Sequence, residues 1–220
     1  MDEDIKKNIL KTGTSLVGIV CSDGIVMAGD RKTTLGGQIV SNKNTLKVVQ
    51  INDYLVISGT GVASDIELAR KLIKAELKLK ELRDKKRPSI KEAASLIAMM
   101  NYKNIRQPAM IPFMAGLMVG GFNSDKTTEL YSIEPAGSST RIEDFDANFS
   151  SGMPYILGML EKNYTKNLTI EEGIHLAADA IKVATERDTA SGYGVDILTI
   201  TKDGIKQVSK QKGEWKYSEE

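Results

Sequence analysis

Two nearly continuous apolar runs near the start of the chain flank an Asp-Gly pair. The runs are residues 15–21 (SLVGIVC) and 25–28 (IVMA), and Asp23-Gly24 lies between them. Apolar runs separated by such a pair are typical of a β-hairpin. Apolar and polar residues do not alternate strictly within the runs, so we expect both faces of these strands to be buried.

A second hairpin and several single strands follow from the same kind of pattern. Residues 195–201 and 205–208 flank Asp203-Gly204, which predicts a hairpin near the C-terminus. Other short apolar runs predict strands at residues 46–51, 55–58, 116–120 and 130–133.

Three segments carry a helix start signal, a Ser or Thr followed three residues later by Glu, which predicts a capping box. These pairs are Ser64 with Glu67, Ser89 with Glu92, and Thr169 with Glu172. Apolar residues then recur at helical spacing on one face, which predicts amphipathic helices. In the first helix these residues are Ile66, Ala69, Ile73 and Leu77. Pro88 ends this helix, and Pro154 begins a fourth one that extends to about Tyr164.

The predicted order is strands, two helices, strands, two helices, strands, which places the chain in the α+β class. Two sheets covered by helix pairs would bury the strands on both faces, and a four-layer α-β-β-α sandwich is one such arrangement. The pattern alone does not select it over other α+β packings. The chain has no internal repeat and no low-complexity linker, and its 220 residues suit one domain.

Composition narrows the function classes. Hydrophobic residues make up 41% of the chain and charged residues 27%, which is ordinary for a globular protein. The formal net charge is +1, so no large electrostatic field favours binding to nucleic acid or to an anionic membrane. Cys21 is the only cysteine, which excludes an internal disulfide and a cysteine-based metal site. The acidic residues 2–4 do not resemble a secretory signal, and the apolar stretch 109–122 is interrupted by Pro and Gly. We expect a soluble cytoplasmic protein without nucleic-acid or membrane partners.

The common catalytic motifs are absent, since the chain contains no GxSxG, GxxxxGK[ST] or HExxH. His175, the only histidine, lies between Ile174 and Leu176 in a predicted helix, and a structural or surface role is favoured over a catalytic one. Cys21 lies within a predicted strand and is interpreted as a small buried hydrophobic residue.

Two loops have both a structural and a functional interpretation. Residues 59–61 (GTG) form either a tight turn before a helix or a loop whose N–H groups face developing negative charge. Residues 187–192 (RDTASG) would by themselves be a helix end with a left-handed glycine. Neither pattern is specific alone.

Taken together, six segments resemble the β-type subunits of the proteasome core particle, which belong to the N-terminal-nucleophile hydrolases. In chain order the segments are residues 13–19 (GTSLVGI), 23–31 (DGIVMAGDR), 46–48 (LKV), 58–65 (SGTGVASD), 151–152 (SG) and 187–192 (RDTASG). The resemblance extends from Gly13 to about residue 208, and its order and separations make it specific. It implies the four-layer sandwich.

The resemblance also implies a threonine endopeptidase that is made as a precursor. Residues 1–13 would be a propeptide removed by autocatalytic cleavage between Gly13 and Thr14. Residues 14–220 would then form a single peptidase domain with a short polar C-terminal tail. Thr14 would be the nucleophile and its freed α-amine, with a pKa of about 8, the base. No metal or organic cofactor is needed.

The other site residues follow from the same resemblance. Lys47, paired with Asp30, would favour the Thr14 alkoxide, and the Gly61 N–H would donate to the oxyanion. Ser151, Asp188 and Ser191 would orient the amine and a water molecule. The substrate-binding residues would be Thr33, Thr34, Gly59, Ala63 and Glu67. Glu67 would either offer its carboxylate to an Arg or Lys side chain, or cap its own helix and leave a pocket for large apolar side chains.

The implied partners are other β-type subunits in a seven-membered ring, α-type rings on either side and, indirectly, an ATP-driven unfoldase. The substrates would be unfolded polypeptides degraded inside a closed chamber. The alternative is a structural or conditionally matured β-type subunit that stays uncleaved and does not cut. An unrelated α+β binding domain would require all six segments to match by chance. One departure is Ser150, where many family members have glycine, which leaves the geometry of that loop open.

Overall fold

The structure, a computed structural model, describes residues 13–212, and side chains as far as residue 208. Its strands form two antiparallel five-stranded sheets, of order β10-β1-β2-β11-β12 and β5-β6-β7-β8-β9, and a separate hairpin β3-β4. The strands of the first sheet are β1 (Leu16–Cys21), β2 (Gly24–Asp30), β10 (Phe145–Asp146), β11 (Gly194–Thr201) and β12 (Gly204–Lys212). The others are β3 (Thr33–Leu35), β4 (Ile39–Asn42), β5 (Val48–Asn52), β6 (Leu55–Gly61), β7 (Ala115–Phe122), β8 (Thr128–Ile133) and β9 (Ser139–Ile142). Both predicted hairpins are confirmed as β1-β2 and β11-β12.

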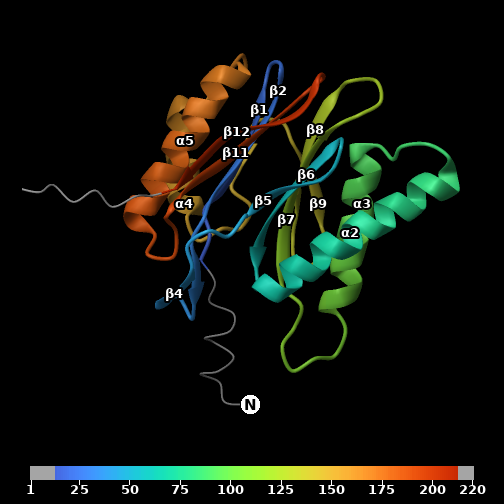
Figure 1. The fold of residues 1–220 in the computed structure, drawn as a ribbon, viewed down its shortest axis with the longest axis horizontal. Coiled ribbons are helices and arrows are strands. Elements are labelled where there is room, and N and C mark those ends of the chain that lie inside the picture. The colour runs from blue at the N-terminus through green and yellow to red at the C-terminus, as the bar shows by residue number, and fades with distance from the viewer. Residues whose placement is uncertain (1–12, 213–220) are drawn as a thin grey trace, which may run out of the picture.

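A pair of helices covers the outer face of each sheet. They are α2 (Ala63–Asp84), α3 (Ile90–Ile105), α4 (Met153–Asn163) and α5 (Ile170–Arg187). Figure 1 shows α4 and α5 against the sheet that contains β1 and β2, and α2 and α3 against the sheet that contains β6 and β7. The four-layer α-β-β-α sandwich is thereby confirmed, and both sheets are buried between the helix layers.

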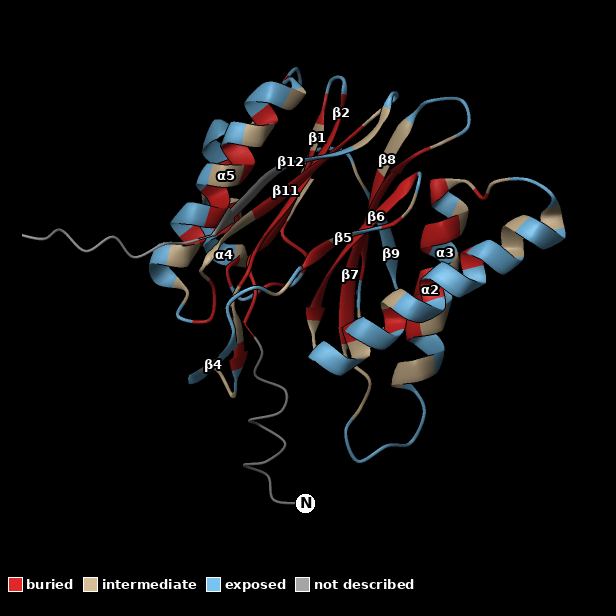
Figure 2. Cartoon of the chain, in the orientation of Figure 1, coloured by how far each residue is buried: buried red, intermediate tan, exposed pale blue. Residues whose placement is uncertain are grey.

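The hydrophobic core has two parts, on the two faces of the first sheet. One lies between the sheets and continues under α2 and α3, and includes Met27, Leu117 and Ile200. The other lies between the first sheet and helices α4 and α5, and includes Val26 and Ile181. All seven residues of β2 are buried, as the unbroken apolar run predicted (Figure 2).

The helix starts agree with the predicted capping boxes in two cases and disagree in one. The boxes at the starts of α3 and α5 are confirmed. The box predicted for Ser64 and Glu67 is wrong, because α2 begins at its N-cap Val62 without a side-chain cap. Gly61, with φ of 120°, turns the chain from β6 directly into the helix, so Ser64 already lies inside the first turn. Glu67 is free to pair with Lys71 instead, at 2.6 Å.

The strands that the pattern missed are short and half exposed. β3, β4, β9 and β10 carry few buried residues, so they have no apolar run to mark them. β5 begins at Val48, two residues later than the apolar run suggested.

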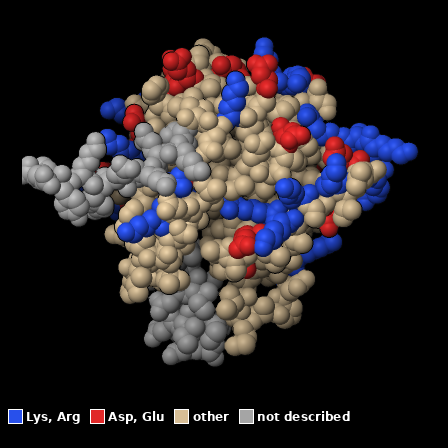
Figure 3. Space-filling view, viewed as in Figure 1, with Lys and Arg blue, Asp and Glu red and all other residues tan. Residues whose placement is uncertain are grey.

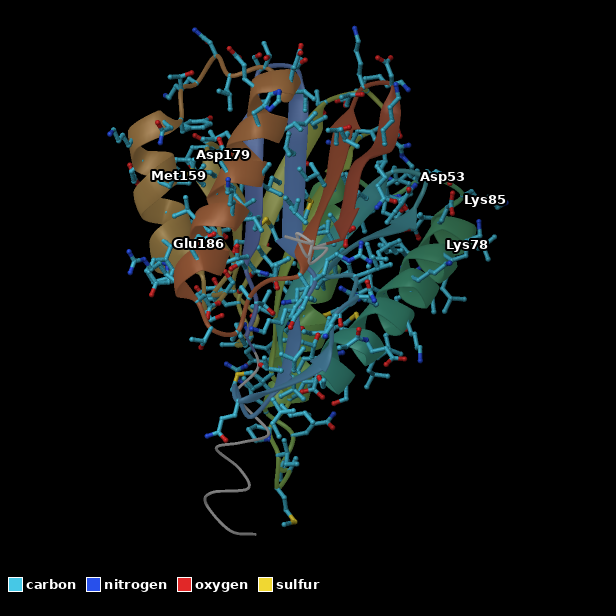
Figure 4. The ribbon with its side chains drawn as sticks, turned by 60° about the vertical axis from the view of Figure 1, so that its left-hand side comes forward. Asp53, Lys78, Lys85, Met159, Asp179 and Glu186 are labelled. Carbon is cyan, nitrogen blue, oxygen red and sulfur yellow. The ribbon has the colours of Figure 1, made fainter. Side chains whose placement is uncertain are left out.

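The outer faces of the helices are charged. Lys78 on α2 and Asp179 and Glu186 on α5 point away from the sheets (Figure 4). Figure 3 shows basic side chains gathered toward α2 with acidic ones among them, consistent with ion pairs along that helix. Within residues 13–212, no helix is long and apolar enough to cross a bilayer.

Candidate active site

The predicted nucleophile, acid and lysine come together where the two sheets meet. Thr14 and Ser15 precede β1, Asp30 ends β2, and Lys47 precedes β5 in the other sheet. Pairing of β1 with β2 places the Ser15 N–H 2.8 Å from Asp30 Oδ1. Lys47 Nζ lies 2.6 Å from the same oxygen, so one ion pair joins the two sheets.

Asp30 is fully buried and all of its contacts are donors. Oδ1 accepts from Ser15 N and Lys47 Nζ, and Oδ2 accepts from Lys32 N at 3.0 Å and Gly192 N at 2.9 Å. A buried charge is tolerated only when it is paired and hydrogen-bonded. These four donors therefore hold the carboxylate in place and compensate its charge.

Lys47 is nearly as buried as Asp30, and its ammonium also contacts the chain at the predicted processing site. Burial lowers the pKa of Lys47 below its ordinary value, and the Asp30 carboxylate offsets part of that effect. Nζ donates to the carbonyl oxygen of Gly13 at 3.1 Å. The lysine thus places a cation against the carbonyl of the Gly13–Thr14 bond.

Thr14 makes contacts on both sides of its own peptide group. Its Oγ1 donates to the Gly13 carbonyl oxygen at 2.6 Å, so that oxygen accepts from both Thr14 and Lys47. Its N–H donates to Ser151 Oγ at 2.9 Å. A side chain at Gly13 would lie 1.7 Å from the Ala190 Cβ, so only glycine fits there.

Asp188 organises the other side of Thr14. Its Oδ2 accepts from Ser151 Oγ at 2.5 Å and from Ser191 Oγ at 2.6 Å, and its Oδ1 accepts from the Ala190 N–H at 3.0 Å. The Ser191 hydroxyl in turn contacts Ser15 Oγ at 2.7 Å. Because Asp188 is the C-cap of α5, the end of that helix fixes both serines beside the start of β1.

The loop that presents Ser151 has an unusual backbone. Asn148 and Phe149 both have positive φ, 45° and 51°, which is rare for residues other than glycine. No sequence signal marked this pair. Ser150, the departure from the family pattern, is buried. Its Oγ accepts a long hydrogen bond from the Leu16 N–H, at 3.5 Å. The loop nevertheless delivers the Ser151 hydroxyl to Thr14.

A cavity of about 480 Å³ opens beside Thr14. Four of the five predicted substrate-binding residues line it: Thr33, Gly59, Ala63 and Glu67. Thr34, the next residue of β3 after Thr33, is buried and does not line the cavity. Gly61, Lys47 and Thr14 line it as well. The cavity therefore joins the predicted substrate-binding residues to the hydroxyl that would react.

The two glycines at the end of β6, Gly59 and Gly61, have different constraints. Gly61 combines φ of 120° with a Cβ position 2.2 Å from the Met114 carbonyl oxygen, so both space and conformation require glycine. A Cβ on Gly59 would lie 2.8 Å from Ile66 Cγ2. The missing side chain at Gly59 is therefore partly a packing requirement of α2.

Several lining residues were missed by the sequence reasoning. They come from the hairpin, from the loop before β5, from β5 itself and from α2: Asn42, Asn44, Thr45, Leu46, Val49, Ile66 and Arg70. No motif marks them, although Arg70 lies seven residues after Ala63 and four after Ile66, on the same helical face. Helical spacing from Glu67 and Ala63 was the signal that could have found it.

The two other reactive residues lie outside this group. His175 is exposed on α5, as its pattern suggested. Cys21 is buried, and burial raises the pKa of its thiol to about 12. Within residues 13–208, no three His, Cys, Asp or Glu side chains converge as a metal site would require. The arrangement around Thr14 suits acyl transfer by a hydroxyl beside a carbonyl that a lysine polarises.

Comparisons with known proteins agree on one family. The family model described as "Proteasome subunit" matches residues 10–200. A "Proteasome subunit beta 2" of Pyrococcus abyssi is 40% identical over 91% of this chain and 92% of its own length. A "Proteasome subunit beta" of Methanobrevibacter smithii is 38% identical over 91% and 93%, and one of Nanoarchaeum equitans is 35% identical over 89% and 96%.

Proposed function

This chain belongs to the proteasome β-subunit family, with archaeal relatives over most of its length, and from that premise we propose that it is a threonine endopeptidase which activates itself by removing residues 1–13. The observation that carries the proposal is the double contact on the Gly13 carbonyl oxygen. Thr14 Oγ1 lies 2.6 Å from it and Lys47 Nζ 3.1 Å. The nucleophile and the cation that would stabilise negative charge on the Gly13 oxygen thus both contact the same peptide bond.

The first step would be attack of Thr14 Oγ1 on the Gly13 carbonyl carbon. The hydroxyl loses its proton to water, and negative charge develops on the Gly13 oxygen, where Lys47 Nζ donates. The intermediate collapses by breaking the bond to the Thr14 nitrogen, which takes up a proton, and leaves residue 13 as an ester on Oγ1. Water then hydrolyses the ester, which releases residues 1–13 and a free Thr14 amine.

The released amine would serve as the base in substrate cleavage. Ser151 Oγ already contacts the Thr14 nitrogen at 2.9 Å, and Asp188 holds Ser151 and Ser191. Through a water molecule the amine would accept the Thr14 hydroxyl proton and return it to the leaving amine of the substrate. An amine blocked within the Gly13–Thr14 peptide bond cannot accept a proton, so the precursor would be inactive.

Lys47 and Asp30 would act in both reactions. The buried Lys47 cation lowers the energy of the Thr14 alkoxide, and Asp30 keeps that cation paired. Gly61, which lines the same cavity as Thr14, would supply its N–H to the oxyanion of the substrate. No metal or organic cofactor enters either step.

The cavity would hold the side chain that precedes the cut, with Thr33, Gly59, Ala63 and Glu67 on its walls. Membership of the family indicates a core particle, and we propose a seven-membered β-type ring stacked against α-type rings. Unfolded polypeptides, fed by an ATP-driven unfoldase, would be the substrates in the cytoplasm. Residues 14–220 would form the single mature domain.

The test is maturation and peptide hydrolysis in particles assembled with α-type subunits. Wild-type chains should lose the mass of residues 1–13 and cleave fluorogenic peptides. Thr14→Ala should keep that mass and show no hydrolysis, whereas Thr14→Ser, which retains a hydroxyl, should mature. Normal maturation of Thr14→Ala would exclude self-cleavage. Assembled wild-type particles that stay uncleaved and inactive would favour the structural or conditionally matured subunit.

A further inference from the structure

Arg70 is a cationic residue of the cavity wall that the proposed chemistry does not use. It lies on the α2 face that also carries Ala63, Ile66 and Glu67, all of which line the cavity. Its Nη1 and Nη2 donate to the carbonyl oxygens of Leu46 at 3.0 Å and Lys47 at 2.9 Å. These two hydrogen bonds hold the guanidinium against residues 46 and 47 of the cavity wall, so its charge stays at the cavity.

Among the lining residues that the structure describes, Glu67 is the only carboxylate, and it pairs with a lysine. Its Oε1 lies 2.6 Å from Lys71 Nζ, and the hydrogen bond from Lys71 is the main reason that the pKa of Glu67 is lowered. The guanidinium of Arg70 adds to that effect. Glu67 therefore interacts with two positive charges, which lie three and four positions further along the helix.

The Glu67–Lys71 pair and the Arg70 guanidinium differ in how firmly they are held. The pair Glu67–Lys71 is exposed on both sides, 67% and 72%, and such surface pairs contribute little and exchange readily with water. Arg70 is held by two backbone carbonyls and its Nε is buried without a hydrogen-bond partner. The fixed charge of the cavity is consequently the positive one.

We propose that Arg70 sets the substrate preference of this cavity, so that the residue before the cut is acidic or apolar rather than Lys or Arg. A side-chain carboxylate would be attracted by the guanidinium, which still has N–H groups beyond the two in use. A lysine or arginine would enter a cavity that already holds a fixed cation. This inference rests on the proposed peptidase function and specifies its substrate class.

The apolar part of the cavity explains why neutral side chains remain acceptable. Leu46, Val49 and Ile66 line it, and Gly59 contributes no side chain. A leucine side chain would bury its surface against these residues without contacting a charge. Cleavage after leucine therefore serves as the internal reference, because it should not depend on the charge at position 70.

The experiment compares three peptides that differ only in the residue before the reporter, Glu, Leu or Arg, on matured particles. In Arg70→Met, kcat/KM for the Glu peptide relative to the Leu peptide should fall about tenfold, and the Arg peptide should gain by a similar factor. Arg70→Lys, which keeps the charge, should keep most of the wild-type ranking. The matched control is Arg83→Met on the same helix, since Arg83 is exposed and lies outside the cavity lining.

The outcomes separate this inference from the function on which it rests. Unchanged ratios among the three peptides in Arg70→Met, with hydrolysis intact, would overturn the role of Arg70 alone. A wild-type particle that prefers the Arg peptide, with that preference lost in Glu67→Gln, would overturn it in favour of Glu67. Absence of hydrolysis of all three peptides by matured wild-type particles would overturn the proposed function and this inference with it.

Discussion

Replacing Gly13 by alanine should block the proposed self-cleavage, because position 13 has no room for a side chain. An added Cβ would lie 1.7 Å from the Ala190 Cβ, 2.7 Å from its Cα and 2.8 Å from its carbonyl oxygen. Real Cβ atoms essentially never approach within 3.0 Å of another heavy atom, so residue 13 or the Ala190 loop would have to move by at least 1.3 Å (3.0 − 1.7).

That displacement is large compared with the contacts on which the reaction depends. The Gly13 oxygen accepts from Thr14 Oγ1 at 2.6 Å and from Lys47 Nζ at 3.1 Å, and a shift of more than 1 Å breaks at least one of these bonds. A misplacement of about 1 Å typically costs about 100-fold in rate. We therefore expect Gly13→Ala to mature about 100-fold more slowly than wild type.

A second substitution tests whether the Ala190 contact is the cause. Gly13→Ala combined with Ala190→Gly removes the shortest contact and leaves the approaches of 2.7 Å and 2.8 Å, which need shifts of only 0.3 Å and 0.2 Å (3.0 − 2.7 and 3.0 − 2.8). The double variant should mature about tenfold faster than Gly13→Ala, because a small shift leaves the carbonyl near Lys47. Ala190→Gly alone is the control and should mature at close to the wild-type rate.

The assay follows the intact mass of the chain after assembly with α-type subunits is started by mixing. The fraction that has lost residues 1–13 is measured over time for all four chains. Maturation of Gly13→Ala at the wild-type rate would refute the steric argument. A double variant no faster than Gly13→Ala would show that the Ala190 side chain is not the obstacle.

Three further predictions concern the buried ion pair, the glycine that ends β6 and the cysteine. Lys47→Ala should reduce the rates of maturation and peptide turnover by at least about 100-fold. Asp30→Asn should impair both because it leaves a buried cation unpaired, and normal rates in assembled particles would contradict the role of the ion pair. Gly61→Ala should lower the free energy of unfolding, measured in urea, by about 2 kcal/mol more than Gly37→Ala does. Both glycines have positive φ, but only at Gly61 would the added Cβ lie 2.2 Å from a backbone carbonyl oxygen. Equal losses in the two variants would argue against that clash. Cys21 should resist iodoacetamide in the native protein at pH 9 and react once urea unfolds it, because burial raises the pKa of its thiol to about 12; rapid native labelling, seen by mass, would contradict its burial.

The parts of the fold that could be predicted from the sequence are those with a strong local sequence pattern. The hairpins at Asp23-Gly24 and Asp203-Gly204 combine turn residues with apolar runs, and the face of α2 that includes Ile73 repeats at helical spacing. The strands β3 and β9 lacked such a signal because they are short and half exposed. The cap assigned to Ser64 failed because the tertiary turn at Gly61, which no local pattern encodes, starts the helix earlier.

The site was accessible only through family resemblance, for a physical reason. Its groups come from the ends of separate elements, and contacts such as that between Thr14 and Ser151 span 137 positions, so no short motif contains them. Arg70 escaped notice because its position matters only once α2 faces the loop before β5. Glu67 was ambiguous because the same spacing fits a helix cap and a pocket wall. It lines the cavity, and its carboxylate pairs with Lys71 instead of capping the helix.

The contacts of Asp30 have a consequence for when the proposed self-cleavage could occur. Its four donors come from the residue before β1, the second residue after β2, the segment before β5 and the loop before β11, which lies 162 positions away. The last of these donors, Gly192, becomes available only after nearly the whole chain has been synthesised. Until then Asp30 Oδ2 lacks one of its two donors, so the carboxylate that pairs with Lys47 is held less firmly. A partly folded chain would therefore be protected from premature scission, and loss of the leader would report that the subunit has completed its fold.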